Sequence, residues 1–232
     1  MVYPTLIKAE GNMPLLKLVD VRNVCLCKLY RFGEYVDSLE PINYSFTTGN
    51  YVVLGDFGDG GWALTYTLSG EPEQEESYRE GNIFLDGNDL GVKELQELTC
   101  YVGHITPDLM NYNNRTLKEI LSLQVGIVQK TLSLDEVIDI FELSDRRLNS
   151  PLNLLSNEIW NATAAIGYCQ NKIIYCFPWL NPHYIKTYLK QRLSTISKCV
   201  KKANGILILP TSSAHGLSKI IDVNNVIKIR RI

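Results

Sequence analysis

A glycine-rich segment between an apolar run and a short helical pattern constrains this chain more than any other feature. The run at residues 51–54 is apolar, which predicts a buried strand. Four of the next seven residues are glycines, and residues 63–68 have the pattern of a helix start. This order predicts a strand, a tight loop and a helix in succession.

The spacing of the glycines matches the phosphate-binding pattern G-x-x-x-x-G-K-[ST]. Gly55 and Gly60 stand in the two glycine positions, with Gly58 between them. In a working loop the lysine reaches the β- and γ-phosphates and the hydroxyl binds Mg²⁺. Here Gly61 and Trp62 take those two positions, so the cation and the metal ligand are missing from a backbone that can still form an anion cradle. An ordinary glycine-rich turn is the alternative interpretation.

Two carboxylates lie inside the same loop. We expect Asp56 and Asp59 to sit where a phosphate would lie, and like charges at close range repel. We expect Trp62 either to fill the phosphate site or to pack on a neighbouring part of the protein. The loop therefore combines the backbone pattern of a phosphate site with side chains that oppose phosphate binding.

The overall composition is that of a globular protein. The 232 residues are 45% hydrophobic and 21% charged, which suits one sizeable domain. A net charge of -2 gives no nucleic-acid signature, so we expect no nucleic-acid partner. No window holds the ~18 apolar residues of a membrane span, and the N-terminus lacks the signal-peptide pattern. The six cysteines form no C-x-x-C pair, so we expect reduced, buried thiols and no metal site.

Apolar strand patterns alternate with helical patterns along the chain. Strands are predicted at residues 15–26, 36–46, 51–54, 82–85, 100–103, 173–177, 205–209 and 223–229. A turn is predicted at 48–50 and a polar surface excursion at 69–81. Helices are predicted at residues 63–68, 92–98, 116–127, 154–166 and 183–200, and another begins at a capping box formed by Ser133 and Glu136. Buried strands between helices indicate an α/β fold with a mostly parallel central sheet.

The composition changes after Pro107. Helical patterns dominate residues 107–167, whereas strand patterns are frequent on both sides of this segment. We therefore predict a single domain over residues 1–232. Residues 1–106 and 168–232 would form its α/β core and an antiparallel β part near the N-terminus, and residues 107–167 would form an inserted helical subdomain.

A hairpin-like segment and several single residues match one known family. Residues 81–90 have the sequence G-N-I-F-L-D-G-N-D-L, and Tyr30, Pro178 and Pro182 stand at matching places along the chain. This set resembles the nucleotide-binding domain of ABC transporters, whose hairpin is G-x-I-x-x-D-G-x-D-hydrophobic. An aromatic residue at the place of Tyr30 stacks on adenine in that family, whereas an ordinary strand tyrosine is the alternative. The resemblance covers nearly the whole chain and implies a P-loop NTPase-like ABC cassette fold.

The same resemblance shows departures at positions that carry chemistry in the family. His104 replaces the glutamine that helps hold Mg²⁺ and water, and Ser156 belongs to a segment that keeps only the first two residues of the signature L-S-G-G-Q. Cys176 and Phe177 replace the two acids of Asp-Glu-Pro, which contact Mg²⁺ and supply the catalytic base. Ser212 replaces the histidine after the last buried strand. Taken by itself, His104 is either a replacement ligand or a hydrogen-bonded loop histidine, and Cys176 is a core residue.

These departures bear on activity, because phosphoryl transfer depends on positioning and on charge stabilisation by lysine, Mg²⁺ and a base that orients water. The resemblance therefore implies a degenerate cassette protein, a non-hydrolysing pseudo-ATPase subunit with no catalytic residue, no metal site and no expected cofactor. The alternative is a functional subunit of an ABC exporter that binds and hydrolyses ATP with Mg²⁺ through atypical motifs. Its remnant nucleotide site would comprise Tyr30, Gly55, Gly58, Gly60, Gly61 and Trp62.

The resemblance also implies partners. A lone cassette is expected to pair with a second ABC-type ATPase subunit, as a hetero- or homodimer, and a membrane permease is a further candidate partner. Such a chain would act by assembly or regulation in the cytoplasm, either free or peripherally at the inner face of the cell membrane. A module that uses the remnant pocket for another anion, or for nothing, is a third hypothesis.

Overall fold

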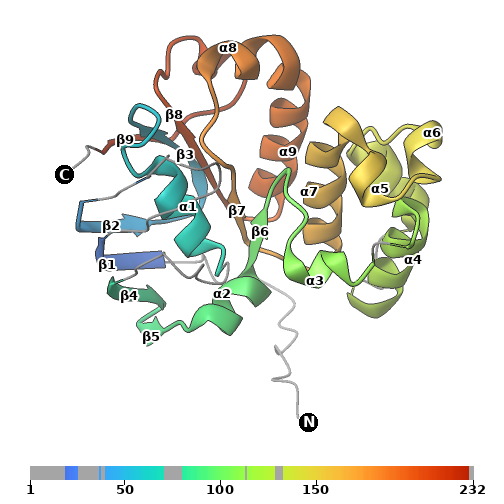
Figure 1. Ribbon diagram of the computed structural model, residues 1–232, viewed down its shortest axis with the longest axis horizontal. Helices are drawn as coiled ribbons and strands as arrows, with labels where there is room; N and C mark the ends of the chain where they lie inside the picture. The colour runs from blue at the N-terminus through green and yellow to red at the C-terminus, as the bar shows by residue number, and fades with distance from the viewer. Residues whose placement is uncertain are drawn as a thin grey trace.

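The computed structural model describes residues 19–25, 37, 40–70, 80–112, 114–128 and 133–229. Within these residues the chain forms a central sheet covered by helices and a second, smaller sheet (Figure 1). The α/β fold with a mostly parallel central sheet and an antiparallel part near the N-terminus is confirmed. No helix in the described part of the chain combines the length and the apolar character needed to span a membrane.

The central sheet is parallel at every pairing, with the strand order β6-β7-β8-β3-β9. Its strands are β3 (Gly49–Leu54), β6 (Thr99–Tyr101), β7 (Ile174–Cys176), β8 (Ile206–Thr211) and β9 (Asn225–Lys228). Every residue of β7 and β8 is buried. Both faces of these strands are covered, which explains why their sequences are continuous apolar runs.

Alternate residues of the inner strands enter two different hydrophobic cores. On one face, Val53, Cys176 and Ile208 pack with α1 (Gly61–Leu68) and α2 (Val92–Leu98). The small antiparallel sheet contributes to this core and has the order β2-β1-β4-β5. Its strands are β1 (Val19–Cys25), β2 (Ile42–Phe46), β4 (Glu80–Leu85) and β5 (Asn88–Asp89).

On the opposite face, Val52, Tyr175 and Leu207 pack with α7 (Ile159–Cys169) and α9 (Lys190–Lys202). Further helices lie beyond α7 in Figure 1: α4 (Leu117–Val128), α5 (Leu134–Ile140) and α6 (Asp145–Leu148). Short elements complete the chain: α3 (Pro107–Met110), α8 (Pro182–Tyr184), a π-helical turn (Ile185–Leu189) and 3-10 turns at Leu152–Leu154, Ser156–Glu158 and Leu217–Lys219. The division into a core and a helical subdomain stays a prediction, because these helices share one hydrophobic core with the sheet.

Several predicted boundaries were wrong. The helix predicted at 154–166 is replaced by 3-10 turns up to Glu158, and α7 follows, because Ser156 has a φ of 52°, outside the helical range. The turn predicted at 48–50 contains the start of β3. The strand predicted at 15–26 and the excursion predicted at 69–81 lie partly outside the described residues.

The capping box is confirmed. Ser133 Oγ accepts a hydrogen bond from the Glu136 N–H at 3.2 Å, and Glu136 Oε2 accepts one from the Ser133 N–H at 2.7 Å. The reciprocal pair satisfies two N–H groups that a helix start leaves without partners. This local rule fixed the beginning of α5.

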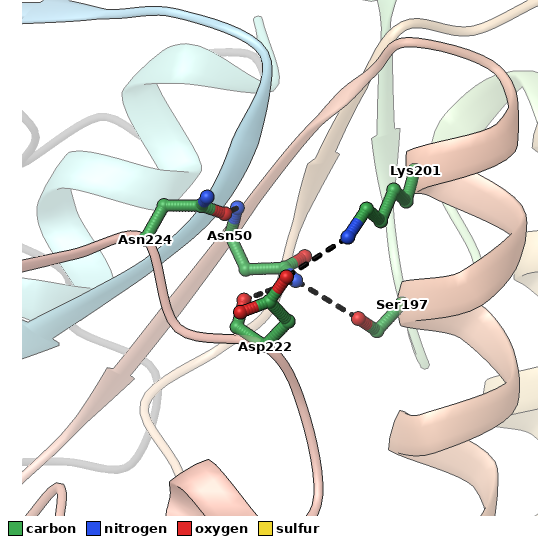
Figure 2. Close-up of polar contacts among 5 residues, drawn as sticks. All are labelled: Asn50, Ser197, Lys201, Asp222 and Asn224. Carbon is green, nitrogen blue, oxygen red and sulfur yellow. Dashed lines mark hydrogen bonds and ion pairs between the residues drawn. The ribbon is translucent and has the colours of Figure 1, made fainter.

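A buried asparagine holds the amino end of β3, opposite to the glycine-rich loop (Figure 2). Asn50 is 2% exposed and donates from Nδ2 to Ser197 Oγ at 3.0 Å and to the Asp222 carbonyl oxygen at 2.7 Å. Its backbone N–H donates to Asn224 Oδ1 at 2.7 Å. Lys201 forms an exposed ion pair with Asp222 at 2.9 Å. Asn50 thereby joins α9 and the segment before β9 to the central sheet.

Replacing Asn50 by alanine should lower the free energy of unfolding by about 1–3 kcal/mol, because the Ser197 hydroxyl and the Asp222 carbonyl oxygen lose their hydrogen-bond donor. Urea unfolding followed by circular dichroism measures this loss. The matched control is Lys201→Ala, which removes the exposed ion pair of the same cluster and should change stability by less than about 1 kcal/mol. Equal losses in the two variants would contradict the role assigned to Asn50.

Candidate functional site

The glycine-rich loop joins β3 to α1 at the carboxyl end of the parallel strands, where ligands bind in open α/β sheets. Two of its glycines adopt left-handed backbone conformations that other residues disfavour, since Gly58 has a φ of 95° and Gly60 a φ of 92°. The Gly55 N–H donates to the Thr211 carbonyl oxygen at 3.2 Å, which ties the loop to the end of β8. The predicted succession of strand, loop and helix is confirmed.

The N–H groups at the start of α1 donate to a side chain from a distant position. The Gly60 N–H donates to Asp37 Oδ1 at 2.8 Å, and the Ala63 N–H donates to Asp37 Oδ2 at 2.6 Å. Asp37 is 5% exposed. The residue before α1 supplies no side-chain cap, and the first turn contains no acidic residue. A carboxyl group of the chain itself therefore binds two amides of the anion cradle.

Burial raises the pKa of the Asp37 carboxyl above its ordinary value. Hydrogen bonds from the backbone of Ala63, Gly60 and Trp62 lower this pKa without cancelling the effect of burial. The nearby Asp59 carboxylate raises the pKa further. The cradle therefore attracts negative charge, but its dry surroundings make that charge costly.

The two aspartates inside the loop are joined by two hydrogen bonds, and only the Asp59 carboxylate takes part. Asp59 Oδ2 accepts from the Asp56 N–H at 2.8 Å, and the Asp59 N–H donates to the Asp56 carbonyl oxygen at 3.1 Å. The expectation that Asp56 and Asp59 lie at the phosphate position stays a prediction, and the Gly60 and Ala63 amides are bound by Asp37. Sequence reasoning missed Asp37, which lies 23 positions before Gly60 with no local motif to connect them.

Three aromatic rings lie beside the loop. Trp179 Nε1 donates to the Gly55 carbonyl oxygen at 3.0 Å, and Phe57 lies edge-on to Trp179 with ring centroids 5.3 Å apart. Phe57 is 46% exposed and its ring centroid is 6.4 Å from that of Trp62. Trp62 packs, partly buried, against the core that α1 shares with the antiparallel sheet. Its buried Nε1 makes no hydrogen bond with the described residues.

The position of the missing lysine is too crowded for a side chain. A Cβ atom on Gly61 would lie 2.8 Å from the Pro210 Cβ and 3.5 Å from the Trp179 Cδ1. The first distance is shorter than a normal van der Waals contact, so a lysine at this position would force either the loop or Pro210 in β8 to shift. The glycine is therefore part of the packing between the loop and the sheet.

Apolar and aromatic side chains pack together at the carboxyl ends of β6 and β7. Cys176 and Phe177 are both fully buried, and burial raises the pKa of the Cys176 thiol well above its ordinary value. Phe177 stacks on Trp160 with a centroid distance of 6.0 Å and an interplanar angle of 10°. A Cβ atom on Gly103 would lie 2.3 Å from the same indole ring. His104 lies edge-on to Tyr101, with centroids 5.5 Å apart.

Other predicted positions are exposed or lie outside the described residues. Ser156 and Ser212 are exposed, whereas Thr211, the neighbour of Ser212, is fully buried and its Oγ1 makes no hydrogen bond with the described residues. Tyr30 lies outside the described residues, so the adenine platform stays a prediction. No sequence motif indicated that Trp160 and Trp179 would contact the residues of this site.

The described residues contain no group of three or more His, Cys, Asp or Glu side chains that could hold a metal ion. A cavity of about 100 Å³ lies beside β6, and its lining residues include Tyr101, Asp108, Thr163 and Lys172. None of its lining residues belongs to the phosphate loop. The described site around the loop is therefore a set of backbone donors bound by Asp37 and bordered by the aromatic side chains of Phe57, Trp62 and Trp179.

No protein-family model matches the chain. The chain is 26% identical over 152 residues to the vitamin B12 import ATP-binding protein BtuD of Vibrio atlanticus (strain LGP32), which covers 62% of this chain and 57% of that protein. The chain thus spans little more than half the length of this curated relative. The matched part is similar to an ABC transporter ATP-binding protein, as the motifs implied.

Solved structures of ABC cassettes resemble this fold. The dimeric structure of MJ0796, a bacterial ABC transporter cassette, superposes with a TM-score of 0.59 at 14% identity, over 91% of this chain and 94% of that one. CbiO1 from Clostridium perfringens, part of the ABC transporter complex cbiONQ, gives a TM-score of 0.56 at 16% identity, over 90% and 85%. The chain has the P-loop fold of an ABC ATP-binding cassette.

Gly61→Ala should destabilise the protein by about 1–3 kcal/mol, because its Cβ overpacks the contact with Pro210. The matched control is Gly91→Ala at the start of α2, where the Cβ meets only the flexible end of the Glu94 side chain. Guanidinium unfolding of both variants gives the comparison. A Gly61→Ala protein as stable as Gly91→Ala would show that the lysine position has room for a side chain.

The raised pKa of Asp37 predicts a pH dependence. The protonated Asp37 carboxyl group contributes to the free energy of unfolding. This contribution is fully present below the pKa of Asp37 in the unfolded chain, about 3.9, and is lost as the pH rises through its higher pKa in the folded protein. The free energy of unfolding of the wild type, relative to Asp37→Asn, should therefore fall across this window. Denaturant unfolding at a series of pH values measures the difference. Asp59→Asn should weaken the effect, since Asp59 contributes to the shift, and a wild type that gains stability across the window would contradict the assignment.

Proposed function

We propose that this chain is an ABC-type cassette subunit that does not hydrolyse ATP and that acts by assembly or regulation. Its proposed partners are a second ABC-type ATPase subunit, in a hetero- or homodimer, and a membrane permease. The sequence similarity to an import ATP-binding protein and the cassette fold support a place among ATP-binding subunits. The dimeric form of the MJ0796 cassette supports a cassette as partner. The proposed location is the cytoplasm, at the inner face of the membrane when a permease is bound.

The observation that carries this proposal is the loss of the charged groups that phosphoryl transfer uses. Glycine and tryptophan stand at the lysine and hydroxyl positions, and the lysine position is closed by Pro210. The two acid positions hold Cys176 and Phe177, which are buried in the core. Removing one electrostatic contributor typically lowers a rate by ~10²–10³. Even with strong non-additivity, the loss of several together supports a chain without useful hydrolysis.

Nucleotide binding is also disfavoured by the loop. A triphosphate would have to displace the Asp37 carboxyl from the amides of Gly60 and Ala63. It would then lie near Asp56 and Asp59, without the lysine that normally offsets phosphate charge. We therefore propose that neither ATP nor Mg²⁺ is a cofactor of this chain and that its contribution to a complex is its shape.

A second candidate is a subunit of an ABC exporter that hydrolyses ATP through atypical motifs. The observation that favours it is the backbone of the loop, in which Gly58 and Gly60 keep the left-handed conformations of a tight turn. This function requires Asp37 to leave the cradle when nucleotide binds. The two candidates differ in whether the wild-type chain binds Mg·ATP and turns it over.

The purified wild-type chain should release no phosphate from Mg·ATP above the buffer background, because the lysine, hydroxyl and acid positions are all uncharged. Phosphate release is measured by a coupled assay, and an intact ABC cassette serves as the positive control. The native mass of the chain, measured by light scattering, should be unchanged by Mg·ATP. Mg²⁺-dependent turnover that co-elutes with the chain over successive columns would contradict the proposed function and favour the exporter.

A further inference from the structure

We infer that Asp37 is the built-in anionic ligand of the phosphate loop, and that its carboxyl group takes the place a phosphate takes in a working loop. Backbone N–H groups of a glycine-rich loop and of the helix after it are the donors that cradle phosphates in nucleotide-binding proteins. In this chain two such N–H groups, from Gly60 and Ala63, each bind one oxygen of the same carboxyl group. The inference rests on the proposed function, because it names what replaces the nucleotide in such a subunit.

The arrangement differs from an ordinary helix cap. In an ordinary cap the side chain belongs to the residue directly before the helix and accepts from an N–H two or three positions ahead. Gly60 holds that position before α1 and has no side chain to offer. The acceptor instead comes from a residue 26 positions before Ala63, and both of its oxygens are used. A remote group that binds through two oxygens corresponds to a bound anion more closely than to a local cap.

Burial explains why these donors need a ligand. Gly60, Gly61 and Ala63 are buried, so water does not freely reach the N–H groups at the start of α1. A buried N–H without an acceptor is rare because it loses the hydrogen bond that it makes to water in the unfolded chain. The described loop supplies no acceptor of its own to Gly60 or Ala63, since the Asp59 side chain accepts from the Asp56 N–H. Asp37 meets this need from within the chain.

Charge explains why a carboxyl group can fill the site where a triphosphate would not. A working loop offsets several phosphate charges with a lysine and with Mg²⁺ held by a hydroxyl. This loop has neither, and Asp56 and Asp59 lie within it. A group with at most one negative charge, fixed by covalent attachment to the chain, needs far less compensation. The absence of the lysine and the presence of Asp37 therefore go together: with less positive charge at the loop, a ligand with less negative charge suffices.

Replacement of the missing anion from solution tests this inference. Asp37→Ala empties the cradle, and inorganic phosphate is the probe, with the melting temperature measured at constant ionic strength. Asp37→Ala should melt several degrees below the wild type and should regain part of that loss saturably as phosphate replaces chloride. The wild type should show only the small, unsaturating rise that phosphate gives most proteins.

The matched control is Asp59→Asn, which removes one negative charge from the same loop and leaves the Asp37 contacts in place. It should respond to phosphate as the wild type does. If Asp37→Ala does not fold, Asp37→Asn keeps the shape of the side chain and carries the same comparison. Phosphate binding measured by calorimetry should be at least tenfold tighter in the Asp37 variant than in the wild type.

The outcomes separate this inference from the proposed function. Two results would overturn the inference. In the first, phosphate changes the melting temperature of the wild type and the Asp37 variant equally. In the second, the Asp37 variant has the melting temperature of the wild type and phosphate does not change it. Either result would leave the absence of ATP turnover, and so the proposed function, unaffected. Turnover of Mg·ATP by the wild type would overturn the proposed function instead.

Discussion

The fold of the site depends on how the buried N–H groups at the start of α1 are satisfied. A glycine-rich loop at the end of β3 turns these donors toward one point, and they require an acceptor there. Asp37 supplies it through two hydrogen bonds to Gly60 and Ala63. The same two bonds connect Asp37, which precedes β2 in sequence, to the loop at the carboxyl end of the inner strand β3. A contact that nucleotide-binding cassettes make with a ligand has become a contact within the chain.

Packing also takes the place of charged or polar groups at the motif positions around the loop. Gly61 lies against Pro210 where a lysine would need space, and Trp62 joins the core of α1. Phe177 stacks on Trp160 at the end of the strand that carries acids in the related family. These contacts are apolar packing at positions where the resemblance places the lysine, the hydroxyl and the acids of the related family.

Local patterns predicted the parts of the fold that local physics determines. The apolar runs of β7 and β8 and the capping box of α5 were visible because burial on two faces and reciprocal capping leave direct marks in sequence. The 3-10 turns before α7 were not predicted, since the residue types around Ser156 do not mark the positive φ of 52° that it adopts. Asp37 was not predicted either. Its role comes from a contact across 23 residues, and no spacing rule identifies the carboxyl group that fills a distant cradle.

The Asp37 carboxyl group binds the amides of the phosphate loop from within the chain. A crystal structure of the full chain grown with saturating Mg·ATP tests whether it keeps that place. Both Asp37 oxygens should remain on the Gly60 and Ala63 N–H groups, and no ordered triphosphate should lie at the loop. A triphosphate with its metal ion gripped between Gly55 and Trp62, and Asp37 displaced from the cradle, would contradict this expectation.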